Sequence, residues 1–472
     1  MHRLHPDRLL PPEPGLRRIA RTLYEGIADL PIVSPHGHVE AAWFRDGYRF
    51  PDAATLMVAP DHYVLRMLIS QGLDYPALGV PGPDGASAGP REVWRTFAGH
   101  YPLFRGTPTR LWLDHALHEV LELPEPLLAE TAERSFDHIA ERLASPEYTP
   151  RALYDRFRIE VLASTDAATD TLEHHAAIAE DPWAARIIPT FRPDAVTDPE
   201  HEAFAASLAT LAEQTGRDVA RWPDYLAALQ DRRAAFRALG ATATDHGVPT
   251  PETADLPPET CQSLLTAALA GTLDATGAVH FRAQMLTEMA AMSAEDGLVM
   301  QIHAGARRNY APSIHANHGR DRGFDLPMAT DWSAGLKPLL DRLGFAQDLR
   351  VVLYTLDEAS YGRDLAPLAG AFPTLRLGAP WWFFDSPLGL SRHFEATVET
   401  AGFANLAGFV DDTRAFLSIP ARHDMYRRAV ASFLAGLVAR HQLGAAEAAE
   451  VAADLAVRNA RDTYRLGEPD DA

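Results

Sequence analysis

Two histidines separated by a single residue, His36 and His38, directly follow a short apolar run at Leu30–Ser34. Side chains alternate along an extended strand, so both imidazoles would point to the same side, where their nitrogens could bind one metal ion. A chain with 20 histidines contains about one such pair by chance, and two loop histidines would show the same spacing. The pair therefore indicates a metal site only if further polar groups converge on it.

Polar residues that can take part in catalysis or substrate binding follow several other apolar runs of the sequence. The carboxyl ends of parallel strands share one face of a barrel, and active sites form there. We therefore expect these side chains to meet at one rim, which packing alone would not explain. They are Asp166, Arg192, His303, Arg308, Trp381, Asp412 and Arg414.

A carboxylate near the end of the chain could complete the metal site. Asp412 and Arg414 are two residues apart, so they would project to one side for as long as the backbone stays extended. Two imidazoles and one carboxylate suit zinc or manganese and leave positions open for substrate oxygens. Either Asp411 or Asp412 could instead cap the following helix, so the spacing alone leaves open which of the two is the ligand.

Several candidates also have ordinary structural interpretations. A buried neutral imidazole at His303 is readily satisfied by backbone hydrogen bonds, and Trp381 is of a residue type that commonly packs in a core. Tyr63 follows Asp61, whose simplest role is to cap a helix. The polar stretch Arg307–Pro327 is long for a connection without regular structure, which is typical of a lid or substrate loop.

The elements that must position these residues are short apolar runs alternating with segments of helical periodicity, which indicates parallel strands buried on both faces. An eighth run is not legible, so closure into a barrel is an inference. Helical insertions are expected at about 41–155 and 199–292, with a C-terminal helical segment at about 425–466. We predict a single α/β barrel domain over residues 1–472. The seven legible runs are Leu30–Ser34, Ile159–Ser164, Arg186–Phe191, Leu298–His303, Leu349–Leu356, Leu375–Gly378 and Leu406–Val410.

The composition excludes several classes of protein. Lys and Arg number 43 against 64 Asp and Glu, and the resulting net charge of -21 repels phosphate backbones and anionic lipids. We therefore expect no nucleic-acid or membrane partner, and we expect a soluble cytoplasmic protein because no signal-peptide core or bilayer-spanning run is evident. Cys261 is the only cysteine, which excludes an intramolecular disulfide and a cysteine-built metal site. The only lysine, Lys337, is expected at the surface rather than bridging two metals.

Taken together, these residues resemble the uronate isomerase (glucuronate isomerase) family, a divergent branch of the amidohydrolase superfamily. The resemblance runs nearly end to end, and its most specific block is Asp412–Ser418 with Arg422–Asp424. The sequence departs from the family pattern at Ala167–Ala168 and at Ala415, but these changes leave the candidate ligands in place. Other matching segments are Pro35–His38, Asp61–Tyr63 with Arg66, Phe191–Asp194, Met300–Ala306 with Arg308, and Trp381–Phe383 with Asp385.

The resemblance implies a distorted (β/α)8 TIM barrel and one divalent metal held by His36, His38 and Asp412. It thereby favours Asp412 over Asp411 as the carboxylate ligand. Zinc is the expected ion, with manganese as the alternative. The resemblance also implies a small sugar acid as substrate. The residues implied in catalysis or substrate contact, besides Asp412, are Tyr63, Arg192, His303, Arg308, Trp381 and Arg414.

The implied reaction moves a carbonyl between C1 and C2 of an open-chain hexuronate, from D-glucuronate to D-fructuronate and from D-galacturonate to D-tagaturonate. A proton must leave C2, giving an enediol or enediolate, and a proton must return at C1. A metal can polarise the carbonyl and hydroxyl oxygens as charge develops. Asp412 is the leading candidate for proton transfer, with Tyr63 or His303 assisting and a metal-bound water as the competitor.

An anionic substrate requires the site to reverse the negative field of the chain locally. Distant carboxylates are screened beyond roughly 8 Å, whereas an arginine fork acts on a carboxylate at contact distance. Arg192, Arg308 and Arg414 are the available cations, and their spacing does not show which one holds the C6 carboxylate.

Two other functions are compatible with the same residues. The same barrel and metal could instead serve a hydrolase or decarboxylase of a small carboxylate substrate, and a non-enzymatic protein that binds sugar acids is a third hypothesis. The three arginines and the lack of a metal-bridging lysine favour the isomerase. The number of copies in the assembly is left open, with a homo-oligomer as one option.

Overall fold

The computed structural model describes residues 4–183 and 185–467, so the remaining positions of the predicted domain lie outside the described residues. Its central sheet is parallel, and its strands follow one another in sequence order. Strand β1 (Ile32–Ser34) pairs with β2 (Ile159–Ala163), and β2 pairs with β4 (Ile187–Ile188). After a short break, β2 continues as β3 (Asp166–Ala167) and β4 continues as β5 (Phe191–Arg192). Strands β3 and β5 pair with each other.

The ladder continues from β5 through the remaining strands. The order is β6 (Ala243–Val248), β7 (Val299–Ala304), β10 (Val351–Thr355) and β11 (Leu375–Leu377), each parallel to the one before it. Leu377 then forms a parallel bridge with Leu406, which begins the last extended segment of the ring.

The fold is a TIM-like α/β barrel that is distorted where its first and last segments meet. Within the described residues, no ladder joins the segment after Leu406 to β1. Instead, the His38 N–H donates a hydrogen bond to the Thr413 carbonyl at 3.0 Å. The predicted run Leu406–Val410 is buried, as expected of a barrel segment, but only its first residue pairs as a strand.

Strands β7 and β10 show why the apolar runs could be recognised in the sequence. Every residue of both strands is buried, because helices cover the outside of a parallel barrel while side chains fill its inside. Such strands are mainly apolar on both faces rather than alternating, which makes them recognisable as apolar runs. The predicted runs at β1, β2, β4, β7, β10 and β11 correspond to strands of the structure.

The prediction of a helical insertion over 199–292 is wrong in its middle, where β6 lies between β5 and β7. This strand was missed because Thr244, Asp245 and His246 interrupt its apolar pattern, although all three are buried. Their polar atoms are satisfied by short contacts, such as 2.9 Å between Thr244 Oγ1 and His246 Nε2. Helices α10 (Phe204–Thr215) and α11 (Trp222–Ala238) precede β6, and α12 (Pro258–Leu269) and α13 (Ala275–Asp296) follow it.

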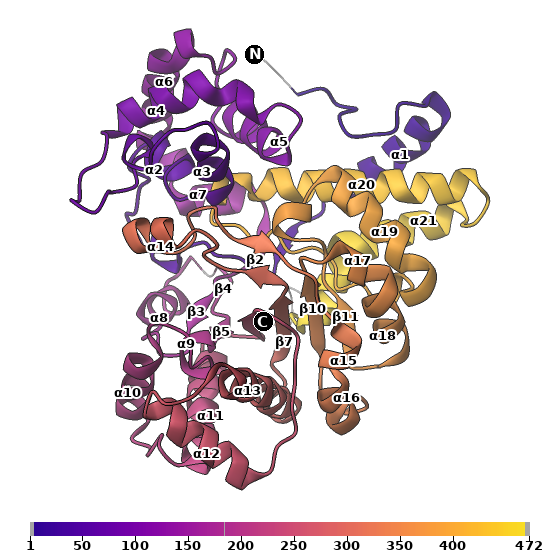
Figure 1. Ribbon diagram of the computed structural model, residues 1–472. Helices are drawn as coiled ribbons and strands as arrows, with labels where there is room; N and C mark the ends of the chain where they lie inside the picture. The colour runs from indigo at the N-terminus through magenta and orange to yellow at the C-terminus, as the bar shows by residue number, and fades with distance from the viewer. Residues whose placement is uncertain (1–3, 184, 468–472) are drawn as a thin grey trace.

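The stretch between β1 and β2 is helical, as expected for 41–155, and has a hydrophobic core of its own. These helices gather at one end of the molecule in Figure 1. Helix α3 begins directly after Asp61, whose carboxylate accepts the Tyr63 N–H at 2.8 Å and so caps it. The helices are α2 (Ala53–Met57), α3 (His62–Ile69), α4 (Pro90–His100), α5 (Pro108–His115), α6 (Ala132–Ala144) and α7 (Pro150–Arg156).

The C-terminal part is helical, and its first helix, α20 (Ile419–Ala439), packs along α1 (Pro14–Ile27) (Figure 1). A turn then leads into α21 (Ala445–Ala453) and α22 (Asn459–Tyr464). The other helices are α8 (Glu173–Ala179), α9 (Asp194–Thr197), α14 (Pro312–His318), α15 (Trp332–Gly335), α16 (Lys337–Leu343), α17 (Glu358–Ser360), α18 (Ala366–Ala371) and α19 (Pro387–Ala401).

Two expectations about single elements can be checked directly. The Lys337 side chain is 69% exposed and pairs with Asp341 in α16, so the lysine lies at the surface as predicted. Among the helices of the described residues, none combines the length and apolar character that crossing a bilayer requires.

Candidate active site

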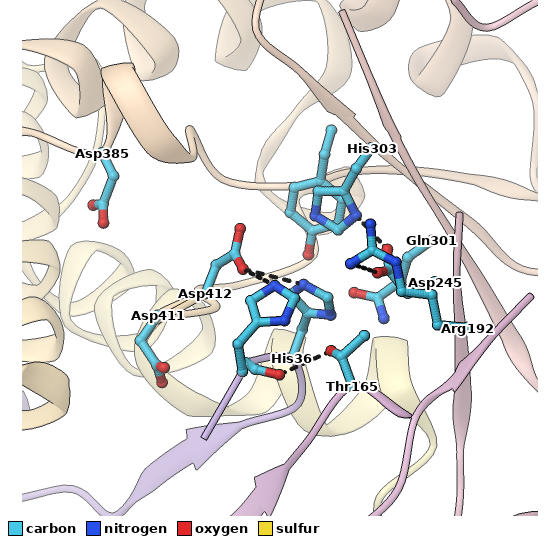
Figure 2. A network of polar contacts seen from close by, with 12 residues as sticks. His36, Thr165, Arg192, Asp245, Gln301, His303, Asp385, Asp411 and Asp412 are labelled. Carbon is cyan, nitrogen blue, oxygen red and sulfur yellow. Dashed lines mark hydrogen bonds and ion pairs between the residues drawn. The ribbon is translucent and has the colours of Figure 1, made fainter. Parts of the chain in front are cut away.

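The two histidines after β1 and the aspartate near the end of the barrel converge on one point, and Figure 2 shows His36 and Asp412 facing each other. The Nε2 atoms of His36 and His38 lie 3.3 Å and 3.0 Å from Asp412 Oδ1. The side chains of His36 and Asp412 are 2% and 9% exposed. The sequence-based expectation of a His-His-Asp cluster is therefore realised in the geometry.

The donor set fits a divalent metal. Asp412 Oδ1 is buried, and no side chain within the described residues offers it a hydrogen bond of acceptable geometry, although two imidazole nitrogens lie close to it. Tetrahedral ligands at ordinary zinc distances would be roughly 3.4 Å apart, close to the observed separations. Burial raises the pKa of the Asp412 carboxyl, but His36 and His38 outweigh this effect and hold the pKa well below its usual range. Asp412 is thus an anion ready to bind a cation.

The backbone at both ends of the chain is shaped to bring these donors together. The Thr165 hydroxyl donates to the Gly37 carbonyl at 2.8 Å, which holds the turn between the two histidines against the next strand. A Cβ at Gly37 would lie only 3.4 Å from Asp411 Oδ1. Asp412 itself has a φ of 41°, a left-handed conformation that non-glycine residues rarely adopt and that is often retained at functional sites.

The choice between Asp411 and Asp412, which spacing could not make, follows from the direction of the two side chains (Figure 2). Asp411 is fully buried, and its Oδ2 lies 3.2 Å from His423 Nε2. The guanidinium of Arg422 also donates to the Asp411 carbonyl at 3.3 Å. Asp411 therefore joins α20 to the barrel, and Asp412 is the carboxylate that meets the two histidines.

A second buried cluster lies beside the metal donors, around His303. Its Nδ1 lies 2.7 Å from Asp245 Oδ1, and Asp245 Oδ2 lies 3.2 Å from a guanidinium nitrogen of Arg192. The His303 ring stacks on that of His36 with centroids 4.7 Å apart. Burial lowers the pKa of His303, which favours a neutral ring that donates from Nδ1 to Asp245. Although His36, Asp245 and His303 are also close enough to hold an ion, Asp245 is already engaged by His303 and Arg192.

The predicted substrate residues line one cavity of about 460 Å³ at the carboxyl ends of the strands. His36 and His303 are not among its lining residues, and neither is Asp166, which sequence reasoning placed at the rim. Asp166 instead accepts a hydrogen bond from Ser164 at 2.7 Å. Among the residues that line the cavity are His38, Tyr63, Arg192, Arg308, Trp381, Asp412 and Arg414.

Tyr63 and Trp381 give the cavity its aromatic walls. Burial raises the pKa of the Tyr63 phenol well above its usual range, so this group stays protonated and can donate a hydrogen bond. The Trp381 ring meets His303 edge-on with centroids 4.8 Å apart. Its indole nitrogen is buried and, in the part of the chain that the structure describes, has no hydrogen-bond partner.

A buried ion pair supports this wall from behind. Arg422 donates to Asp385 Oδ2 at 2.5 Å, and its guanidinium carbon lies 3.6 Å from the ring centroid of Trp112 and 5.4 Å from that of Tyr63. Burial raises the pKa of Asp385 to about 7, although the neighbouring Arg422 opposes the rise. The pair therefore fixes the positions of the Trp112 and Tyr63 rings, although burying the two ionisable groups costs desolvation energy.

The two exposed arginines of the cavity are each paired with an aspartate from the stretch Arg307–Pro327. Arg308 lies 3.3 Å from Asp325, and Arg414 lies 2.7 Å from Asp321. This stretch has more structure than the sequence suggested, because β8 (Ala306–Arg307) and β9 (Leu326–Pro327) form an antiparallel base and α14 lies between them.

Sequence reasoning missed Asp245, Asp321 and Asp325. Asp245 was hidden in the strand that was taken for part of a helical insertion, and the requirement for an eighth barrel strand was the signal that could have found it. No sequence signal distinguished Asp321 or Asp325 from other acidic loop residues, because their roles depend on ion pairs formed only in the folded chain.

Together, the fold and the site describe a TIM-like barrel enzyme with a candidate His-His-Asp metal site at the carboxyl ends of its strands. Comparison with known proteins places the chain more narrowly. A family model for glucuronate isomerase matches residues 16–464. The chain belongs to the glucuronate isomerase family and is an enzyme of the isomerase class.

Individual relatives agree with this assignment over the whole length. A uronate isomerase from Xanthomonas axonopodis pv. citri is 54% identical over 465 residues, covering 98% of each chain. The crystal structure of glucuronate isomerase from Caulobacter crescentus matches with a TM-score of 0.97 and 49% identity, covering 99% of this chain and 98% of the other. A uronate isomerase structure from Thermotoga maritima matches with a TM-score of 0.91 and 29% identity, covering 98% and 100%.

Proposed function

We propose that this protein interconverts aldo- and keto-hexuronates, D-glucuronate with D-fructuronate and D-galacturonate with D-tagaturonate. The observation that carries the proposal is that a His-His-Asp donor set, of which His38 and Asp412 line the cavity, lies beside three arginines that line it too. An acidic protein has no general affinity for a sugar acid, so cations gathered at one concave site favour a carboxylate-bearing substrate. A hydrolase or decarboxylase remains the second candidate from sequence alone, but family membership favours the isomerase.

The residues divide into groups with distinct roles. Asp412, an anion at the metal site, is our candidate for moving the proton between C2 and C1 of the substrate. Tyr63, protonated because it is buried, would donate a hydrogen bond to a substrate oxygen. His303, held by Asp245, presents a neutral Nε2 that can accept a proton or hydrogen bond. Trp381 would shield the reacting carbons from water.

A divalent metal at His36, His38 and Asp412 would supply Lewis-acid polarisation of the substrate carbonyl when bound. We propose zinc, because two imidazoles and one carboxylate match its common catalytic ligand set, with manganese as the alternative. The net charge of -21 further supports a protein that binds neither nucleic acid nor anionic membranes, and we propose a cytoplasmic location. A homo-oligomer remains a prediction, to be tested by light scattering.

The experiment is to incubate the metal-loaded protein with D-glucuronate or D-galacturonate in deuterated water and to follow the products by NMR. We expect D-fructuronate and D-tagaturonate, with deuterium at C1 to the extent that the base exchanges its proton with solvent. Formation of neither ketose by a sample of verified metal content would contradict the proposal and favour the hydrolase or decarboxylase. Asp412→Asn is the negative control, because it removes the charge of the proposed base and metal ligand while keeping the shape of the side chain.

A further inference from the structure

A chain of hydrogen bonds runs through the interior of the barrel behind His303. Tyr464 donates to Gln301 Oε1 at 2.9 Å, and the hydroxyl oxygens of Tyr354 and Tyr464 lie 2.5 Å apart. A hydroxyl carries one proton, and that of Tyr464 goes to Gln301, so Tyr354 is the donor to Tyr464. All three side chains are fully buried. The two hydrogen bonds therefore have one direction and are shielded from solvent.

The ring of Tyr354 packs against the face of the His303 imidazole. The two rings are nearly parallel, at 8°, and their centroids are 4.2 Å apart. The two residues are direct partners in the ladder between β10 and β7. A Cβ at Gly378, directly after β11, would overlap the Tyr354 ring, so this ring occupies a space that only a glycine leaves open. The Tyr354 ring is therefore held by the backbone on one strand and contacts His303 on the other.

The last helix of the described residues, α22, carries Tyr464 into the barrel. The Asn459 side chain donates from Nδ2 to the Leu406 carbonyl at 2.9 Å. Arg461 donates from Nε to Glu160 Oε1 at 2.9 Å, and Glu160 lies on β2. These contacts join α22 to the last segment of the barrel and to its second strand. Tyr464 therefore reaches its partners from a firmly held helix.

Apolar side chains could fill this interior without burying polar atoms. Two hydroxyls and an amide are unfavourable there unless each is hydrogen-bonded, and a fully satisfied network specifies a single arrangement of side chains. The ring fixed by this arrangement is the one that contacts His303. Asp245 holds the His303 imidazole at one edge, through Nδ1, which leaves the ring free to tilt about that contact. A ring stacked on its face restricts the tilt and hence the direction of Nε2.

We propose that Tyr354 and Tyr464 are positioning residues: their hydrogen-bonded hydroxyls hold the Tyr354 ring against His303 and so direct His303 Nε2 toward the bound substrate. This inference rests on the proposed function, in which His303 accepts a proton or a hydrogen bond. It adds that the C-terminal helix supports the reaction without touching the substrate. Loss of either hydroxyl should therefore slow turnover rather than weaken substrate binding.

The test is a set of double-variant cycles with the metal-loaded protein and D-glucuronate. Tyr354→Phe and Tyr464→Phe each remove one hydroxyl, and Tyr354→Leu removes the ring. Each is combined with His303→Gln, which has no imidazole to be held. Tyr101→Phe is the matched control, because Tyr101 is a buried tyrosine that donates to Asp114 at 3.0 Å in the helical insertion. Metal content and unfolding temperature are measured for every variant.

We expect Tyr354→Phe and Tyr464→Phe to lower kcat about three- to tenfold, the range of one buried hydrogen bond, with KM within about twofold of wild type. Tyr354→Leu should lower kcat further. In the His303→Gln background the same substitutions should change kcat by less than about twofold, because residues that act through one another are not additive. Equal effects in both backgrounds, a loss confined to KM, or an equal loss of kcat in Tyr101→Phe would overturn the inference.

A measurement without turnover separates this inference from the proposed function. The NMR signal of the His303 Cε1–H group, assigned by its loss in His303→Gln, reports the ring current of Tyr354. It should shift in Tyr464→Phe and in Tyr354→Leu and stay in place in Tyr101→Phe. These shifts in a protein that forms no ketose from either hexuronate would overturn the isomerase proposal and leave the support of His303. Normal isomerisation with an unmoved signal in Tyr464→Phe would overturn the positioning role alone.

Discussion

Asp245 fixes the orientation of His303: its Oδ1 lies 2.7 Å from Nδ1 of the ring, which leaves the other nitrogen, Nε2, buried and without a hydrogen-bond partner in the described residues. Both residues sit on neighbouring parallel strands, β6 and β7. A buried nitrogen without a partner is costly unless a ligand satisfies it. We therefore propose that the pair keeps Nε2 available for a bound ligand.

Replacing Asp245 by Asn should lower kcat by about 10- to 100-fold, the usual cost of losing an orienting partner of a site histidine. The metal content should stay at the wild-type level, because His36, His38 and Asp412 are untouched. Asp194→Asn is the control: it removes a carboxylate from Arg192 without contacting His303, so we expect a smaller change in kcat than in KM. Equal losses of kcat in the two variants would contradict an orienting role for Asp245.

Substitutions of the two adjacent aspartates, Asp411 and Asp412, should differ in their effect on bound metal. Asp412→Asn should lose bound metal and about 10³-fold or more of turnover while it remains folded. Asp411→Asn should keep its metal but unfold at a lower temperature, because Asp411 pairs with His423 in the core. Elemental analysis after dialysis, with thermal unfolding of each variant, provides the measurement. Metal loss in Asp411→Asn alone would reverse our assignment of the ligand.

Removing only one member of the buried ion pair between Arg422 and Asp385 should strongly destabilise the protein. Arg422→Met leaves a buried carboxyl without its cation and should lower the free energy of unfolding by about 3–5 kcal/mol. Asp385→Leu combined with Arg422→Met should recover part of this loss. Arg363→Met, at a pair with Asp364 in which the arginine is 57% exposed, should cost less than about 1 kcal/mol. Urea unfolding would measure all of these, and a double variant no more stable than Arg422→Met would refute the explanation.

Asp166 should make the protein less stable as the pH rises. Burial, with a contribution from Asp170, raises its pKa to about 7 in the folded state, so the folded protein binds more protons than the unfolded chain between about pH 4 and 7. The stabilisation is complete below the unfolded pKa and is lost as the pH rises through about 7. It amounts to at most about 4 kcal/mol, at 1.36 kcal/mol for each unit of pKa difference.

Asp166→Asn, which resembles the protonated carboxyl, should therefore unfold at more nearly equal temperatures at pH 5 and pH 8 than the wild type does. Asp170→Asn is the comparison, because it removes one cause of the raised pKa and should give a smaller change in the same direction. An Asp166→Asn variant with the wild-type dependence on pH would show that another group is responsible.

The sequence predicted those parts of the site that depend on strand ends. Fully buried, mainly apolar strands such as β7 and β10 are legible, and the residues at the ends of such strands meet at one rim for geometric reasons. This was enough to bring His36, His38, His303 and Asp412 into one expected site. The resemblance to a known family then favoured Asp412 over Asp411.

The rest was not predictable because it depends on buried polar pairs. The strand that carries Asp245 reads as polar, and its burial is tolerated only because His303 and Arg192 satisfy the carboxylate across the barrel. The approach of Asp321 to Arg414 similarly joins two loops whose relative position no local pattern encodes.

The barrel closes between its first and last segments, which are far apart in the sequence. The first and last segments of the ring are joined by the hydrogen bond from His38 to Thr413 and by the donors that His36, His38 and Asp412 contribute. A ribosome that has released only the first strands cannot complete the ring, because the carboxylate that meets them is translated near the end. The growing polypeptide must therefore keep an open sheet edge until Asp412 has been synthesised, and only then are all three candidate metal donors available together.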